Sequence, residues 1–150
     1  MKSTKRALPL LMADDDEEDC MLTEEALRES RLTNPLFFVH DGEELLAFLR
    51  REGQYADAPR PGLILLDLNM PRKDGREALS EIKEDPNLRS IPVVVLTTSL
   101  NESDIDHSYN LGANSYIAKP ITFKALVETL LALNRYWFQI VELPGEDHAG

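Results

Sequence analysis

The chain has 150 residues, of which 43% are hydrophobic, and this is the usual size of a single domain that buries its own core. Acidic residues outnumber basic ones 27 to 16, and the basic residues are scattered, so direct binding of nucleic acid is not expected. The lone cysteine excludes an intramolecular disulfide, and the N-terminus carries neither a signal-peptide pattern nor a long apolar run. We therefore expect a cytoplasmic protein that does not contact the membrane.

Five short apolar runs, each bounded by turn-forming residues, predict five β-strands. The third run is four consecutive aliphatic residues, which is typical of a strand buried on both faces. Residues 1–7, before the first strand, are predicted to be a loose leader. In chain order, the predicted strands cover residues 8–13, 36–40, 63–66, 91–97 and 115–118.

A helical pattern follows each predicted strand. The first helix begins with acidic and ends with basic residues, which suits the helix dipole, and Gly112 is placed to end the fourth in a left-handed conformation. The loop at 53–62 is expected at the surface, away from the strand ends. The predicted helices cover residues 17–31, 43–52, 76–85, 103–111 and 122 onward. This alternation predicts an α/β fold with a doubly wound, five-stranded parallel sheet.

Polar residues follow the predicted strands at the edge where their carboxyl ends meet. The first strand delivers Asp14 and Asp15, the third Asp67, the fourth Thr97 and the fifth Lys119. Ligands of open parallel sheets bind beyond this edge. Three neighbouring carboxylates repel one another, so a cation is expected between them. Oxygen ligands without a Cys or His pair favour a hard ion, and we expect Mg²⁺ rather than Ca²⁺ or Zn²⁺.

A carboxylate beside a metal ion, a lysine and a hydroxyl is suited to accept a phosphoryl group as a nucleophile. The ion and Lys119 would neutralise the phosphoryl oxygens, while Thr97 could donate a hydrogen bond to one of them. A carboxylate is ordinarily ionised at neutral pH, so a carboxylate nucleophile requires no histidine base. The three histidines all fall outside the predicted site: His40, His107 and His148.

With these residues the sequence resembles the receiver domain of two-component response regulators, over about residues 8–133. The intervals from Asp67 to Thr97 and to Lys119 fit that family. The resemblance implies the flavodoxin-like (βα)5 receiver fold and a phosphorelay in which a histidine kinase phosphorylates Asp67 in a Mg²⁺-dependent reaction, with Mn²⁺ able to substitute. It also implies a cis peptide at Lys119-Pro120, which would aim the lysine inward.

The resemblance assigns roles to individual residues as metal ligands, as phosphate-binding groups and as parts of a switch. Asp67 is the implied phosphoacceptor, and Lys119 binds the phosphoryl group. Thr97 and Tyr116 form the implied switch, in which Thr97 moves toward the phosphoryl group and Tyr116 follows it. The implied metal ligands are Asp14, Asp15, Asp67 and the backbone carbonyl of Asn69.

The run Asp14-Asp15-Asp16 holds one carboxylate more than a metal-binding pair needs. Either Asp14 and Asp15 or Asp15 and Asp16 could form the pair. The end of the first strand at Ala13 favours Asp14 and Asp15, with Asp16 capping the next helix. The following acids, 17–19, are interpreted as a solvated helix start, because the helix dipole already favours acids there.

Aromatic and β-branched residues crowd the C-terminal extension, residues 134–150. It could continue the last helix and bury Trp137 and Val141, or it could form an exposed patch that pairs with a second copy. We favour a homodimer through the last helix and this tail. The tail and the loop at 53–62 also resemble standalone receivers that partner bacterial phytochrome kinases.

The predicted function is a phosphorylation-controlled signalling switch without a DNA-binding output domain. It would catalyse its own phosphorylation and dephosphorylation but would not be an enzyme acting on a separate substrate. One alternative is an aspartyl-phosphate hydrolase of the haloacid-dehalogenase type, but such enzymes place a second Asp where this chain has Asn69. The other alternative is an adaptor that no longer accepts phosphate.

Overall fold

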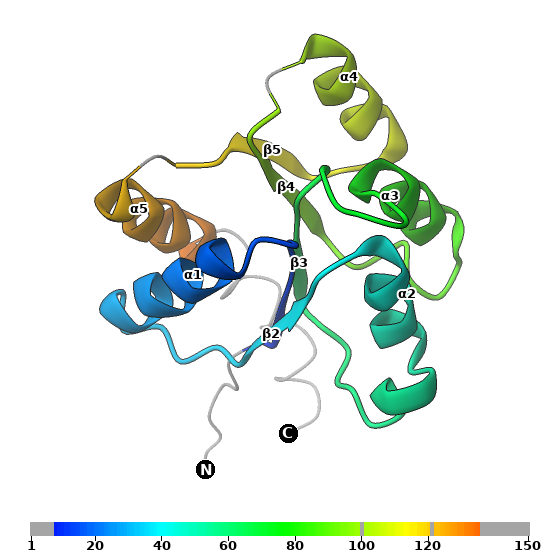
Figure 1. The fold of residues 1–150 in the computed structure, drawn as a ribbon, viewed down its shortest axis with the longest axis horizontal. Coiled ribbons are helices and arrows are strands. Elements are labelled where there is room, and N and C mark those ends of the chain that lie inside the picture. The colour runs from blue at the N-terminus through cyan, green and yellow to red at the C-terminus, as the bar shows by residue number, and fades with distance from the viewer. Residues whose placement is uncertain (1–7, 100, 121, 136–150) are drawn as a thin grey trace.

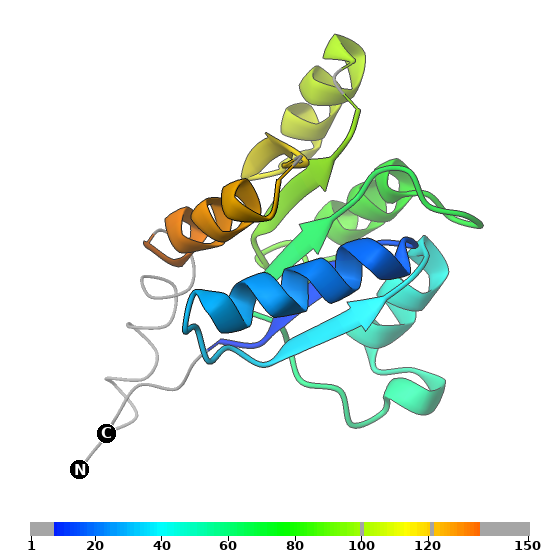
Figure 2. The same ribbon diagram turned by 60° about the vertical axis from the view of Figure 1, so that its left-hand side comes forward.

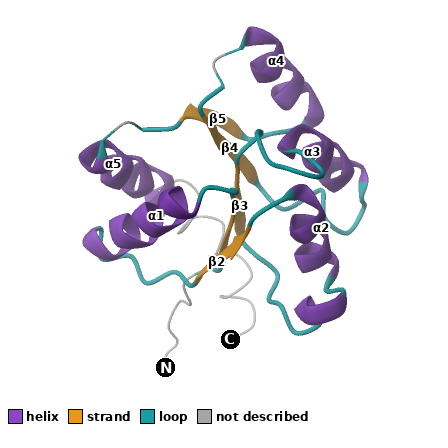
Figure 3. Cartoon of the chain, viewed as in Figure 1, coloured by secondary structure: helices purple, strands orange, loops and turns teal. Residues whose placement is uncertain are grey.

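The computed structural model describes residues 8–99, 101–120 and 122–135. Its sheet has five parallel strands in the order β2-β1-β3-β4-β5, so the predicted α/β architecture is confirmed (Figures 1 and 3). The strands are β1 (Leu10–Ala13), β2 (Leu36–Val39), β3 (Leu63–Leu66), β4 (Val93–Thr97) and β5 (Ser115–Ala118). The helices are α1 (Glu17–Glu29), α2 (Gly42–Arg50), α3 (Gly75–Glu84), α4 (Glu102–Leu111) and α5 (Phe123–Leu133), with a 3-10 helix, η1 (Gly53–Tyr55), after α2.

Helices cover both faces of the sheet. Helices α1 and α5 lie on one face and α2, α3 and α4 on the other, as the two views in Figures 1 and 2 show. Along β1, Leu11 and Ala13 pack with the cluster under α2 and α3, while Leu10 and Met12 pack with the cluster under α1 and α5. Burial on both faces explains why the strands read as continuous aliphatic runs.

Strands β1, β2 and β4 and helices α1 and α2 are shorter than the sequence pattern predicted. The first and fourth strands begin only after Pro9 and Pro92, which have no N–H group to donate to a sheet. Helices α1 and α2 are followed by Arg31 and Arg51, whose φ angles of 61° and 56° are left-handed. No glycine marks these two helix ends, so no sequence signal indicated the left-handed turns.

No helix within the described part of the chain, residues 8–135 with two single gaps, has the length and apolar character of a membrane span.

Gly75, the first residue of α3, lets this helix start directly against the end of β3. Its N–H donates to the Leu68 carbonyl at 2.9 Å. A Cβ atom at this position would lie 2.3 Å from the Asp67 carbonyl oxygen and 2.6 Å from the Leu68 Cα. The need for glycine here comes from close backbone approach, and the site residue Asp67 is part of that contact.

We expect Gly75→Ala to lower the free energy of unfolding by about 1–3 kcal/mol, because the added methyl group must push backbone atoms apart. Urea denaturation measures this loss. Gly53→Ala is the control, because a Cβ atom added at Gly53 would meet nothing within 4 Å, while the φ angle of this residue is +58°. That change reports backbone strain alone, about 1 kcal/mol. A smaller loss for Gly75→Ala than for Gly53→Ala would contradict the steric argument.

Candidate functional site

The polar residues at the strand ends meet at one edge of the sheet. The Asp67 N–H donates to the Ala13 carbonyl at 3.0 Å, and the Lys119 N–H donates to the Thr97 carbonyl at 2.9 Å. These bonds continue the strand ladders by one residue and hold the polar side chains at the same level. Asp14, directly after β1, is buried beside them.

Asp67 is the centre of the site and is only 6% exposed. Its Oδ1 accepts hydrogen bonds from Thr97 Oγ1 at 2.8 Å and from the Asn69 N–H at 3.2 Å. Its Oδ2 accepts one from Lys119 Nζ at 2.9 Å. Both carboxylate oxygens are therefore held in place, by groups from two distant segments and by the N–H of Asn69 in the same loop.

Lys119 is shared among three carboxylates. Besides Asp67, its Nζ lies 2.6 Å from Asp19 Oδ2 and 2.8 Å from Asp14 Oδ2. Burial by itself would lower the pKa of Lys119, but the contacts with Asp14, Asp19 and Asp67 outweigh burial and raise this pKa above its usual value. Lys119 therefore stays charged and is the cation around which the acids gather.

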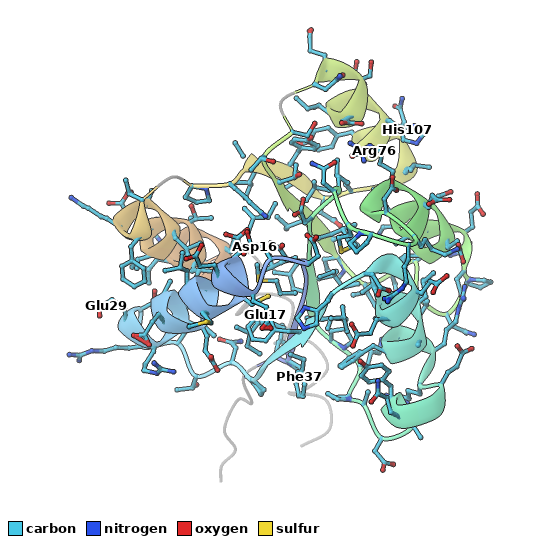
Figure 4. All side chains as sticks on the ribbon, viewed as in Figure 1. Asp16, Glu17, Glu29, Phe37, Arg76 and His107 are labelled. Carbon is cyan, nitrogen blue, oxygen red and sulfur yellow. The ribbon has the colours of Figure 1, made fainter. Side chains whose placement is uncertain are left out.

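Asp14, Asp15 and Asp67 form a compact carboxylate cluster. Each offers an oxygen, and these oxygens all lie within 4.8 Å of one another. Asp16 turns away from the cluster and caps α1, accepting hydrogen bonds from the N–H groups of Glu18 at 2.9 Å and Asp19 at 3.4 Å. The predicted helix cap is thus confirmed, and Figure 4 labels Asp16 where α1 begins.

The charge balance at Asp14 indicates where a cation fits. Burial raises the pKa of Asp14 to about 6, against the lowering effect of Lys119 and of the Asp16 N–H. Asp14 Oδ2 touches Lys119 without hydrogen-bond alignment, and among the described residues it has no hydrogen-bond partner. A buried carboxylate oxygen that has an ion pair but no aligned hydrogen bond, beside two further carboxylates, is suited to a hard divalent ion such as Mg²⁺ or Mn²⁺.

The family model for the response regulator receiver domain matches residues 10–131. The chain belongs to the response regulator receiver family. This membership favours the predicted receiver over the dehalogenase-type alternative. The receiver is 45% identical to the response regulator Rcp1 of Synechocystis sp. over 135 residues, which are 90% of this chain and 92% of Rcp1.

Two solved receivers share both sequence and fold with this chain. The phosphorylated cyanobacterial phytochrome response regulator RcpA is 47% identical with a TM-score of 0.85, covering 93% of this chain and 99% of RcpA. The Mn²⁺-bound form of Rcp1 is 44% identical with a TM-score of 0.82, covering 91% of this chain and 99% of that one.

Tyr116 of the receiver lies in β5 and is tied to the loop after β4. Its hydroxyl donates to the Ser99 carbonyl at 2.9 Å, and its N–H donates to the Tyr109 hydroxyl at 3.1 Å. The ring is partly buried against the cluster under α2 and α3. A movement of the segment that follows Thr97 would therefore move the hydrogen-bond acceptor of the Tyr116 hydroxyl.

The interpretation of residues 17–19 as a solvated helix start is wrong for Asp19. Glu17 and Glu18 are exposed, but Asp19 is partly buried and contacts Lys119. Asp19, Thr23 and Ala26 recur at helical spacing on the inner face of α1, and Thr23 and Ala26 are buried. This periodicity was available in the sequence and would have placed Asp19 at the site.

The implied cis peptide at Lys119-Pro120 is also wrong, because no cis peptide occurs among the described residues. The trans chain keeps the Lys119 N–H on the Thr97 carbonyl, and the long lysine side chain still reaches Asp67. The flexible four-carbon stem makes a special backbone unnecessary.

Two site residues were missed in sequence reasoning because their partners are distant in the chain. Arg76 on α3 pairs with Asp104 on α4, and Asp104 also accepts a hydrogen bond from Ser99 Oγ at 2.7 Å. Arg76 and Asp104 each fit the pattern of ordinary charges on a helix surface.

The predicted contacts of Trp137 and Val141 lie outside the described residues.

Proposed function

We propose that Asp67 is the phosphoacceptor of this receiver and that the chain switches its surface when Asp67 is phosphorylated. The convergence of Lys119 and Thr97 on the two oxygens of one buried carboxylate carries this proposal. Phosphoryl transfer needs little covalent chemistry from a protein, so positioning and charge neutralisation do most of the catalysis. The buried ammonium and hydroxyl supply both next to the nucleophile.

In the proposed reaction an oxygen of Asp67 forms a bond to the phosphorus atom of a phosphohistidine. The bond from phosphorus to the imidazole nitrogen breaks and its electron pair stays on that nitrogen. The other ring nitrogen carries a proton, so the leaving group is neutral imidazole. Lys119 pairs with the growing charge on the phosphoryl oxygens and Thr97 donates a hydrogen bond to one of them. Mg²⁺ held by Asp14, Asp15, Asp67 and the Asn69 carbonyl would further neutralise that charge.

The product is an acyl phosphate, which adds negative charge and acceptor oxygens next to Thr97. A shift of Thr97 toward the phosphoryl group moves the segment up to Ser99, and Tyr116 is bonded to the Ser99 carbonyl. The face formed by α4, β5 and α5 would then change its arrangement. Attack of water on phosphorus would later release inorganic phosphate and restore the carboxylate, so we infer that the receiver also limits its own signal.

Intact-protein mass after incubation with acetyl phosphate tests the proposal. We expect wild type to gain one phosphoryl group only when Mg²⁺ is present, and Asp67→Asn to gain none. Asp57→Asn, in an exposed loop, is the matched control and should behave as wild type. If wild type stays unmodified, phosphotransfer from a phosphorylated histidine kinase is the next measurement. Failure there as well would leave the adaptor alternative.

The partner of this receiver is proposed to be a histidine kinase of the phytochrome type. The similarity to RcpA, a phytochrome response regulator, supports this assignment. A purified bacteriophytochrome kinase labelled with radioactive phosphate should transfer the label to wild type and not to Asp67→Asn. Transfer no faster than to an unrelated receiver would contradict the pairing.

We further propose residues 8–133 as the receiver, 1–7 as a leader and 134–150 as an extension that joins two copies. Support for an interface comes from α5, where two large apolar side chains, Phe123 and Leu131, are each 40% exposed. Sedimentation of the phosphorylated and unphosphorylated protein tests this: removal of residues 136–150 should shift any dimer to monomer.

A further inference from the structure

An ion pair joins α3 to α4 beside Asp67, and the proposed reaction does not use it. Arg76 Nε donates to Asp104 Oδ1 at 2.7 Å, and Arg76 Nη2 donates to Asp104 Oδ2 at 2.7 Å. The side chains are 30% and 17% exposed, and Figure 4 shows Arg76 between α3 and α4. The hydrogen bonds from Arg76 and Ser99 lower the pKa of Asp104 to about 2, so this pair stays ionised at physiological pH.

Asp104 also holds the loop that links β4 to α4. Ser99 Oγ donates to Asp104 Oδ2 at 2.7 Å, while the Ser99 N–H lies 3.4 Å from Thr97 Oγ1. The Ser99 carbonyl accepts the Tyr116 hydroxyl. Thr97 and Tyr116, the two residues expected to move, therefore meet at Ser99, and Asp104 fixes the side chain of that residue.

Together with the covalent link between Asp67 and Leu68, these contacts form a closed ring of residues that includes Asp67. Its members, in order, are Asp67, Thr97, Ser99, Asp104, Arg76 and Leu68. The hydrogen bonds that Asp104 accepts are 2.7 Å long, whereas Arg76 Nη1 is 3.4 Å from the Leu68 carbonyl and Ser99 N is 3.4 Å from Thr97 Oγ1. The ring is therefore tight at Asp104 and at the 2.8 Å bond from Thr97 to Asp67, and loose at the two 3.4 Å contacts, which involve Leu68 and Ser99.

We propose that Arg76 and Asp104 are positioning residues that hold Ser99 and the start of α4 in the unphosphorylated arrangement, so that their ion pair opposes the shift of Thr97. This proposal rests on the proposed role of Asp67. The segment after Thr97 can follow the phosphoryl group only if Ser99 leaves Asp104 or if Asp104 moves away from Arg76. The pair therefore sets the population of the switched arrangement and, through it, the rate of phosphoryl uptake.

A geometric link must be distinguished from a general effect of charge near the site. The planar guanidinium holds both oxygens of Asp104, whereas a lysine would keep the positive charge and lose the two-pronged geometry. Arg76→Lys should therefore behave as Arg76→Gln does. The double variant Arg76→Gln/Asp104→Asn should match the single variants, because all of them break the same link.

Amide hydrogen exchange on the unphosphorylated protein is the first measurement. We expect the N–H groups of α4 and Ser99 to exchange about tenfold faster in Arg76→Gln, Arg76→Lys and Asp104→Asn than in wild type. The amides of α1 should not change. Arg28→Gln is the control, since it breaks an exposed ion pair with Glu25 on α1. Unchanged exchange at α4 and Ser99 would overturn the proposal.

The rate of phosphoryl uptake from acetyl phosphate is the second measurement. At saturating Mg²⁺ it should rise about three- to tenfold in the same variants, while the Mg²⁺ concentration for half-maximal rate stays at the wild-type value. A slower or unchanged rate, or recovery of wild-type behaviour in Arg76→Lys, would overturn the proposal. A wild type that takes up no phosphoryl group from acetyl phosphate or from a phosphorylated kinase would contradict only the proposed role of Asp67. Hydrogen exchange would still test the link, because it needs no phosphorylation.

Discussion

Lys119→Met should slow phosphorylation of Asp67 about 100-fold, because one charged donor aimed at developing charge is worth roughly that factor. The same change should lower the free energy of unfolding in metal-free buffer by about 3 kcal/mol, since it leaves buried carboxylates without their cation. The side chains of Asp14 and Asp67 are only 1% and 7% exposed, so solvent cannot replace the ammonium. Mass spectrometry and urea denaturation give the two values.

Mg²⁺ should restore stability more in Lys119→Met than in wild type, because in the variant it is the remaining cation that the acids can share. The matched control is Lys124→Met, which removes an exposed lysine from the first turn of α5 and should leave both quantities unchanged. A variant at Lys119 that is phosphorylated within about threefold of the wild-type rate would rule out its proposed role.

The metal-free protein should lose stability as the pH rises, and Asp14 is the cause. The folded chain raises the pKa of this carboxyl from 3.8 to about 6, so the fold prefers its protonated form. The stabilising contribution of the protonated form is complete below about pH 4 and is lost as the pH rises through about 6. From this group alone, the free energy of unfolding should fall by about 2–3 kcal/mol between about pH 4 and pH 8.

Asp14→Asn isolates this effect from other titrations, because the amide stays neutral at every pH. In EDTA, the free energy of unfolding of the variant, measured by urea denaturation, should rise relative to that of wild type as the pH rises. Mg²⁺ should reduce the difference by binding to wild type at neutral pH, where the carboxylate is ionised. If the free energy of unfolding of wild type rose relative to that of the variant instead, the pKa of Asp14 would have to lie below its usual value.

The fold was readable from sequence because the local signals agree with one another. Aliphatic runs such as Leu63–Leu66 can only be buried on both faces, and β3 and β5 begin and end at the predicted residues. The strand-end positions of Asp67, Thr97 and Lys119 follow from parallel topology, and their side chains do converge. The left-handed turns at Arg31 and Arg51, which follow α1 and α2, could not be predicted, because arginine rarely takes a left-handed conformation.

Contacts between distant segments account for most of what sequence reasoning missed at the site. Lys119 reaches Asp19 across the space between β5 and α1, and Arg76 reaches Asp104 between two helices. Arg76 and Asp104 each also fit a helix surface, so no local pattern in the sequence indicates that they pair. Only the packing of α1, α3 and α4 on the sheet brings the partners together.

The hydrogen bond from the Tyr116 N–H to the Tyr109 hydroxyl has a consequence for self-assembly. Strand β5 lies at the margin of the sheet, where an unpaired row of N–H groups would invite a strand from another molecule. The hydroxyl oxygen of Tyr109, on α4, accepts a hydrogen bond from one of these groups, the N–H of Tyr116. Strand β5 therefore offers one fewer free N–H group to a strand from another molecule, while the Tyr116 hydroxyl donates to the Ser99 carbonyl.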